Sequence, residues 1–152
     1  MATDGNYFAL QPLIMQRIRE AKIPGLGEIM PARDLHLLEE QRIDDAAVYV
    51  LYDKESVPNG SDYQPGEWQL VQQQWLIVLC TKNYADARCG DLDRAGPLLY
   101  AINKTLQGWR PGSGLGPLTK VGSPSASYSE KTSLYPLRYT SLIQLEGNNP
   151  YE

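Results

Sequence analysis

The chain has 152 residues, of which 42% are hydrophobic and 21% are charged, and this size and composition predict one globular domain over residues 1–152. Two cysteines and one histidine exclude a disulfide framework and the usual ligand spacing of a metal site, and they fit a reduced intracellular protein. No stretch approaches the roughly 18 apolar residues of a membrane span, and the first ten residues lack the pattern of a signal peptide. We therefore expect no membrane partner.

Charge is distributed unevenly along the chain. The net charge of −4 combines −7 over residues 1–93 with +3 over residues 94–152. Ten tyrosines accompany a single phenylalanine, and tyrosine suits surfaces that become interfaces because it joins an apolar ring to a polar tip. An acidic half joined to a basic half indicates self-association through complementary surfaces, with chance scatter of solvated charge as the alternative.

The first half of the chain predicts two helices, a short extended piece, a strand and a long loop. Apolar residues at helical spacing predict an amphipathic helix that ends before Pro24. A short extended piece over 27–34 and a short helix over 32–40 follow. The apolar run at 46–52 predicts a strand buried on both sides, and residues 54–66 predict a long exposed loop because they are rich in Ser, Pro, Asn and Gly. The residues of the helix stripe are Leu10, Leu13, Ile14, Ile18 and Ala21.

A second long strand is expected over 68–81. Its apolar end pairs with 46–52 as a hairpin, and its polar middle, Gln72 to Gln74, is expected to be exposed.

The clearest periodicity in the chain predicts a helix over 91–109. Asp91 and Asp93 complement the helix dipole at its start, and Gly108 is placed to end it in the left-handed conformation. Pro97 predicts a kink, or a helix that begins near Gly96. The predicted buried stripe is Leu92, Ala95, Leu99, Ile102, Leu106 and Trp109. We expect this stripe to pack on the face of the second strand that carries Trp75, Ile77 and Leu79.

A Gly-Pro linker at 110–117 precedes a second hairpin, formed by 118–128 and 133–145. One face of its last strand carries Tyr135, Leu137, Tyr139, Ile143 and Leu145. The order helix, hairpin, helix, hairpin predicts an α+β fold, with a mixed or mainly antiparallel sheet of about four strands and two main helices on one face.

The sequence shows no pattern of residues that is typical of a catalytic site. His36 is the single histidine and is expected to be structural. The adjacent acids Glu39/Glu40 and Asp44/Asp45 point apart on a helix or loop, so they are expected to be solvated. The glycines at 112, 114 and 116 follow a helix, the reverse of a phosphate-binding loop. We expect no catalytic, cofactor-binding or metal-binding residues, and no enzyme activity.

Several blocks in register along the chain carry a family resemblance. They are PLIMQRIREAKIPGL, ARDL, VYVLYD, QQWLIVLCTKNYAD, AGPLLYAINKTLQGW, PLTKV and YPLRYTS. Their combination resembles the tail terminator proteins of long-tailed (siphovirus or Mu-like) bacteriophages and prophages. The resemblance implies a small structural subunit of the virion, assembled in the host cytoplasm into a hexameric ring that caps the tail tube and stops its polymerisation. It implies as partners the tail tube protein and a head connector or neck protein, with genome DNA passing through the lumen without specific binding.

A head-to-tail ring needs two complementary patches on each subunit, and the charge asymmetry suggests them. We expect the acidic Asp34, Asp44, Asp45 and Asp62 to approach the basic Arg110, Lys120 and Arg138 of a neighbour, aided by Tyr63, Tyr84 and Tyr128. The alternatives are another neck or head-completion protein, and a small enzyme or nucleotide-binding protein whose site is dispersed in sequence.

Overall fold

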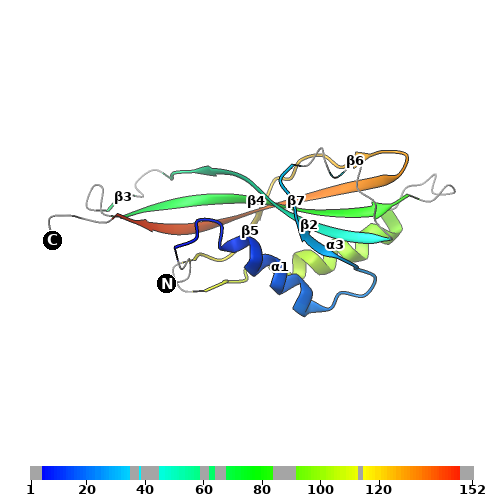
Figure 1. Ribbon diagram of the computed structural model, residues 1–152, viewed down its shortest axis with the longest axis horizontal. Helices are drawn as coiled ribbons and strands as arrows, with labels where there is room; N and C mark the ends of the chain where they lie inside the picture. Colours follow the sequence, from blue (N-terminus) through cyan, green and yellow to red (C-terminus); the bar gives the residue numbers. More distant parts are fainter. Residues whose placement is uncertain are drawn as a thin grey trace.

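The computed structural model describes residues 5–34, 38, 45–58, 62–63, 68–83, 92–112 and 115–147. Over these residues the chain forms an α+β fold, in which two helices, α1 (Leu10–Ala21) and α3 (Leu92–Leu106), cover one face of a long twisted sheet (Figure 1). The predicted fold class and the placement of both helices on one face are confirmed. None of the described helices is long and apolar enough to cross a membrane.

The sheet has seven strands among the described residues, where the sequence predicted about four. Its main path runs β1 (Ile29–Pro31), β2 (Ala46–Ser56), β4 (Trp68–Lys82), β7 (Thr132–Glu146), β5 (Thr119–Val121). β3 (Asp62–Tyr63) pairs with β4, and β6 (Ser127–Tyr128) pairs with β7. Among the strands that the structure describes, β1 and β2 form the one parallel pair. The extended piece predicted over 27–34 contains β1, the single strand predicted over 118–128 is instead the two short strands β5 and β6, and β3 was not predicted. Strands of two or three residues have no readable periodicity and are defined by backbone pairing with a long strand.

β4 and β7 are antiparallel over their whole length, from Trp68 opposite Glu146 to Lys82 opposite Thr132. Fifteen residues each give these strands a length of about 50 Å. β2 pairs with β4 as the predicted hairpin, with a bulge between Tyr52 and Lys54. The predicted loop at 54–66 is therefore partly wrong, because β2 continues to Ser56 and residues 62–63 form β3. The rest of 59–67 lies outside the described residues.

α1 ends as the sequence predicted, before Pro24. Lys22 adopts the left-handed conformation, with φ of 48°, and its backbone N–H donates to the carbonyl of Arg19. The helix buries Leu10, Ile14, Met15 and Ile18 against the sheet. The short helix expected over 32–40 lies largely outside the described residues.

α3 differs from its prediction in which residues it buries. The helix begins at Leu92 and continues through Pro97, and Gly108, with φ of 76°, follows its end as predicted. Leu92 is 58% exposed, and Leu99 is only partly buried. The stripe is rotated because α3 packs on α1 as well as on the sheet. The buried residues are Ala95, Leu98, Ile102 and Leu106.

The main core lies between the two helices and the inner face of β2, β4 and β7. Trp75, Ile77 and Leu79 belong to it together with residues of α3, as predicted. Gln73 is also fully buried, which contradicts the expectation that the three glutamines are all exposed. Its Nε2 donates to the carbonyl of Tyr7 at 2.8 Å, and its Oε1 accepts from Trp75 Nε1 at 3.2 Å. Alternation along β4 places Gln73 on the inner face, and these bonds satisfy it there.

A second cluster buries the opposite face of the same strands. Residues 46–51 are therefore buried on both faces of the sheet, as predicted for 46–52, and Tyr52 is partly buried. Its members are Leu38, Ala47, Tyr49, Leu51, Leu76, Val78, Cys80 and Leu134.

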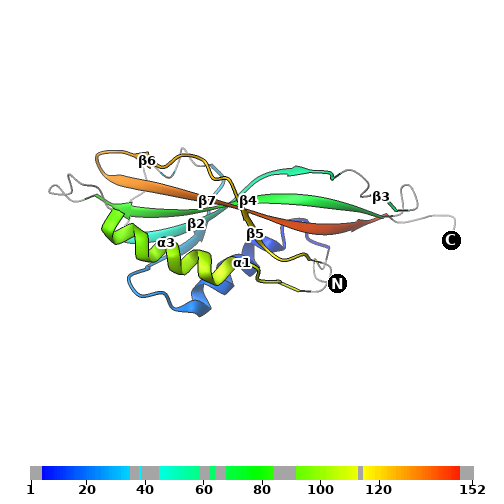
Figure 2. The same ribbon diagram turned by 180° about the vertical axis from the view of Figure 1, so that it is seen from behind.

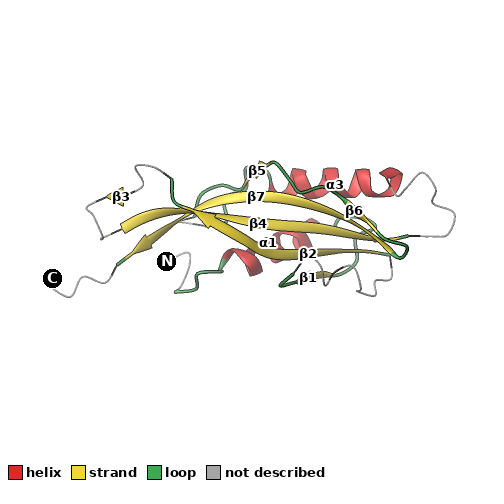
Figure 3. Cartoon of the chain, turned by 90° about the horizontal axis from the view of Figure 1, so that it is seen from above, coloured by secondary structure: helices red, strands yellow, loops and turns green. Residues whose placement is uncertain are grey.

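Both clusters are concentrated in one half of the sheet, although Val71 and Ile143 extend the main cluster into the other half. In the other half, β4 and β7 extend beyond both helices (Figures 1 and 2). We call this extension, residues 53–56, 68–74 and 140–146, the arm. Seen from above, it continues the long axis of the sheet away from the helical layer (Figure 3).

Candidate assembly surfaces

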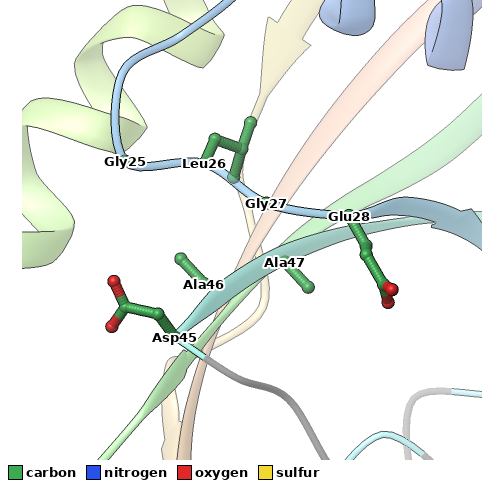
Figure 4. Close-up of a pocket in the computed structure, with 7 residues that line it drawn as sticks. All are labelled: Gly25, Leu26, Gly27, Glu28, Asp45, Ala46 and Ala47. Carbon is green, nitrogen blue, oxygen red and sulfur yellow. The ribbon is translucent and has the colours of Figure 1, made fainter.

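The first hollow that could hold a small molecule lies at the end of the sheet opposite the arm. It has a volume of about 200 Å³ and is lined by Gly25 to Glu28 and by Asp45 to Ala47. Its two carboxylates, Glu28 and Asp45, point away from each other (Figure 4). Asp45 also accepts a hydrogen bond from Arg94 at 2.7 Å. The hollow therefore does not bring two acids together for acid–base chemistry.

A larger hollow, of about 490 Å³, lies beside the end of β1. It is lined by Gln11, Leu38, Tyr49 and residues 30–34. The amide of Gln11 donates to the carbonyl of Val50 at 2.9 Å, and burial raises the pKa of the Tyr49 hydroxyl. This lining offers no nucleophile with an adjacent base.

Metal-binding and nucleophilic groups are not gathered in the described part of the chain. No three His, Cys, Asp or Glu side chains come together there. Cys80 is fully buried, and burial raises its thiol pKa to about 12, so the thiol stays protonated and unreactive at neutral pH. His36, Glu39, Glu40 and Asp44 lie outside the described residues. The expected absence of catalytic and metal-binding residues stays a prediction.

Two of the predicted interface residues form ion pairs within their own subunit. Asp45 pairs with Arg94 at 2.7 Å. Arg138 Nε lies 3.1 Å from Asp53 Oδ2, and the same guanidinium donates to the carbonyl of Gly122. Arg138 thus joins β2, β7 and the segment after β5 across the sheet.

The other predicted interface residues do not form one cluster. Asp34, Arg110 and Lys120 are exposed on separate elements. Tyr128 is 60% exposed, and its ring meets that of Tyr135 edge-on at 5.9 Å. Asp62 and Tyr63 are described only as the backbone of β3, and Asp44 and Tyr84 lie outside the described residues.

Exposed apolar side chains that sequence reasoning missed lie in two regions of the subunit. One is the arm, where Leu142 is 36% and Leu145 is 37% exposed on opposite faces of β7. The other lies on α3, where Leu92 is 58% and Tyr100 is 74% exposed. The sequence pattern placed Leu92 on the buried stripe of its helix and Leu145 on one face of the last strand, and it singled out neither Leu142 nor Tyr100. No sequence signal distinguishes these positions, because their exposure depends on which sides of α3 and β7 other elements cover.

Tyr139 and Asn103 form a polar link inside the core. The Tyr139 hydroxyl donates to Asn103 Oδ1, and Asn103 Nδ2 donates to the carbonyl of Leu99 at 2.8 Å. Tyr139 is fully buried, and this burial raises its pKa to about 12. The link ties β7 to α3 only while the hydroxyl keeps its proton.

We expect this link to make stability fall in alkali. The folded pKa of Tyr139, about 12, exceeds the value of 10.0 for a free tyrosine. Its contribution is therefore complete below pH 10 and is lost as pH rises through 12. Between pH 9 and pH 12 the wild type should lose about 2 kcal/mol more unfolding free energy than Tyr139→Phe. Urea unfolding of both proteins at each pH measures this difference, and equal losses would contradict it.

Comparison with known proteins identifies the class of molecule that this fold defines. The family model of the phage tail terminator protein matches residues 4–149. Among solved structures, a chain from "Virion of native gene transfer agent (GTA) particle" superposes with a TM-score of 0.57, at 16% identity over 89% of this chain and 94% of that chain. At this identity the likeness concerns the fold. No curated protein sequence matches.

The chain belongs to the phage tail terminator protein family. It is a structural protein of a phage tail, as the sequence resemblance predicted, and the family is structural rather than enzymatic.

Proposed function

We propose that this protein forms a closed hexameric ring on the end of the tail tube, stops tube polymerisation and joins the tube to the head connector. The family match over residues 4–149 carries this proposal. The structure supports it through its two unlike exposed apolar surfaces, on the arm and on α3. A subunit in a head-to-tail ring must present one surface and receive another, whereas a two-fold dimer uses one surface twice.

The charge distribution supplies a second, weaker contribution to ring closure. Asp34 from the acidic half and Arg110 and Lys120 from the basic half are exposed and suited to contacts between subunits. Exposed ion pairs contribute about 0–1 kcal/mol each, so they guide closure more than they stabilise it. The lumen passes genome DNA without specific binding, and assembly takes place in the host cytoplasm before the ring joins the virion.

Ring formation predicts a mass of about 102 kDa, six times the 17.0 kDa chain, by native mass spectrometry of the purified protein or of protein released from tails. If apolar contacts dominate closure, the mass should persist when salt is raised from about 0.1 to 1 M, where the screening length shortens from about 10 Å to 3 Å. If charge dominates, rings should dissociate over that range. Monomers or dimers alone in assembled tails would contradict the ring.

Tube capping requires a separate test. Added to polymerising tube protein, the ring should stop elongation and be found at one tube end by electron microscopy. Binding to isolated connectors without any effect on tube length would instead favour a neck or head-completion protein.

A further inference from the structure

One face of the arm carries two leucines among polar residues: Leu142 is 36% exposed, and Leu70 is partly buried. Pairing of β4 with β7 places Gln72 opposite Leu142, and Leu70 opposite Gln144. Because paired residues lie on the same face of a sheet, Leu70 and Leu142 are diagonal neighbours. Glu146, two residues beyond Gln144, continues this face. We call this surface the arm face; it carries Leu70, Leu142 and Glu146 together with Trp68, Gln72 and Gln144.

The other face of the arm is a different surface. Val71 and Ile143 are paired on it and are buried by the core, while Leu145 lies on the same face nearer the tip. Leu142 and Leu145 are thus almost equally exposed, at 36% and 37%, on opposite sides of one strand. This pair offers a matched comparison.

The outward side of α3 has the features of a surface that receives such a face. Gly96, Pro97, Tyr100 and Lys104 are exposed at helical spacing. An added Cβ at Gly96 would meet nothing within 4 Å, although glycine inside a helix costs about 1 kcal/mol relative to alanine. Gly96 therefore leaves a flat area on the helix beside the ring of Tyr100, which is 74% exposed. No contact within the described part of the subunit requires a glycine at this position.

Charge at the two surfaces is complementary. Lys104, one turn beyond Tyr100, forms no ion pair with the described residues. Glu146 on the arm face accepts a hydrogen bond from the amide of Gln144 and forms no ion pair with the described residues. Seven residues of β7 extend the arm by about 24 Å, which is long enough to lie across more than two turns of a helix.

We propose that the arm face docks on the outward side of α3 of the neighbouring subunit, with Leu142 and Leu70 packed on Tyr100 and the flat area at Gly96, and with Glu146 near Lys104. This inference rests on the proposed ring and names the contact that closes it. A second copy is the occupant because the same chain carries both unlike surfaces, apart from one another, and a head-to-tail ring needs both on every subunit.

Substitutions that leave the subunit folded test this contact. Leu142→Asp should raise the protein concentration at which half of the subunits are assembled by at least about tenfold, because it places a charge in a buried apolar contact. Leu145→Asp, on the opposite face, should change it less than about threefold. Tyr100→Ala, on the receiving surface, should weaken assembly as Leu142→Asp does. Circular dichroism establishes that each variant is folded, and sedimentation measures assembly.

Cross-linking tests the geometry directly. In a Cys89→Ser background, oxidation of the double variant Leu142→Cys/Tyr100→Cys should give a ladder of linked subunits up to six. The matched Leu145→Cys/Tyr100→Cys protein should give little linking.

The outcomes separate the two proposals. If wild-type rings form, while Leu142→Asp and Tyr100→Ala assemble normally and no ladder appears, the docking contact is wrong and the ring stands. If Leu142→Asp rings assemble normally but no longer cap tubes, the arm face contacts the tube protein and the inference is again overturned. If the wild type forms no ring in solution or in tails, the proposed function itself fails.

Discussion

Trp75→Ala is expected to lower the free energy of unfolding by about 3–5 kcal/mol. The Trp75 side chain is fully buried, and its ring meets those of Tyr52 at 5.3 Å and Phe8 at 6.2 Å, both edge-on. Its removal leaves a cavity between the N-terminal segment and β4. It also removes the Nε1 donor on which the buried Gln73 amide depends. The cavity and the lost hydrogen bond both lower the free energy of unfolding.

Urea denaturation at fixed protein concentration measures this effect, because stability depends on concentration in an assembling protein. Trp75→Phe is the matched control. It keeps most of the ring and loses the N–H, so it should cost clearly less than alanine. A cost below about 1 kcal/mol for Trp75→Ala would mean that the surrounding residues collapse into the space, or that the ring is not buried.

Ile102→Ala should cost about 2–5 kcal/mol, whereas Leu99→Ala should cost at most about 2 kcal/mol. Ile102 is fully buried in the main core, while Leu99 is only partly buried beside it. The sequence stripe assigned both residues to the core, so the comparison tests the orientation of α3. The same urea titration measures both free energies of unfolding. Equal losses for the two variants would mean that α3 has the orientation expected from the sequence, with Leu99 in the core.

The proposed ring gives the arm a role. In that ring, the extension of β4 and β7 past the helices lets each subunit reach its neighbour, and Leu142 is placed for an apolar contact there. Arg138, which the charge asymmetry suggested as a contact between subunits, pairs with Asp53 in its own chain, and its role between subunits stays a prediction. The contact proposed between the arm face and α3 is mainly apolar.

The sequence alone determined the elements that have a strong local period. The helix over α1, the hairpin of β2 with β4 and the helix ending at Gly108 follow from apolar spacing and from the conformational freedom of glycine, which act within a few residues. The family followed from short blocks spread over the chain, because a family signal sums over many positions.

Only the tertiary structure decided which side of each element is covered. Gln73 is buried because α1 and the N-terminal segment lie over its face of β4, and Leu142 is exposed because no described element lies over its face of β7. The rotation of α3 toward Leu98 likewise depends on its contact with α1. Local sequence specifies the period of a helix or strand. Burial, in contrast, depends on which elements distant in the chain pack on it. The arm exists because β4 and β7 are longer than the helices that cover them.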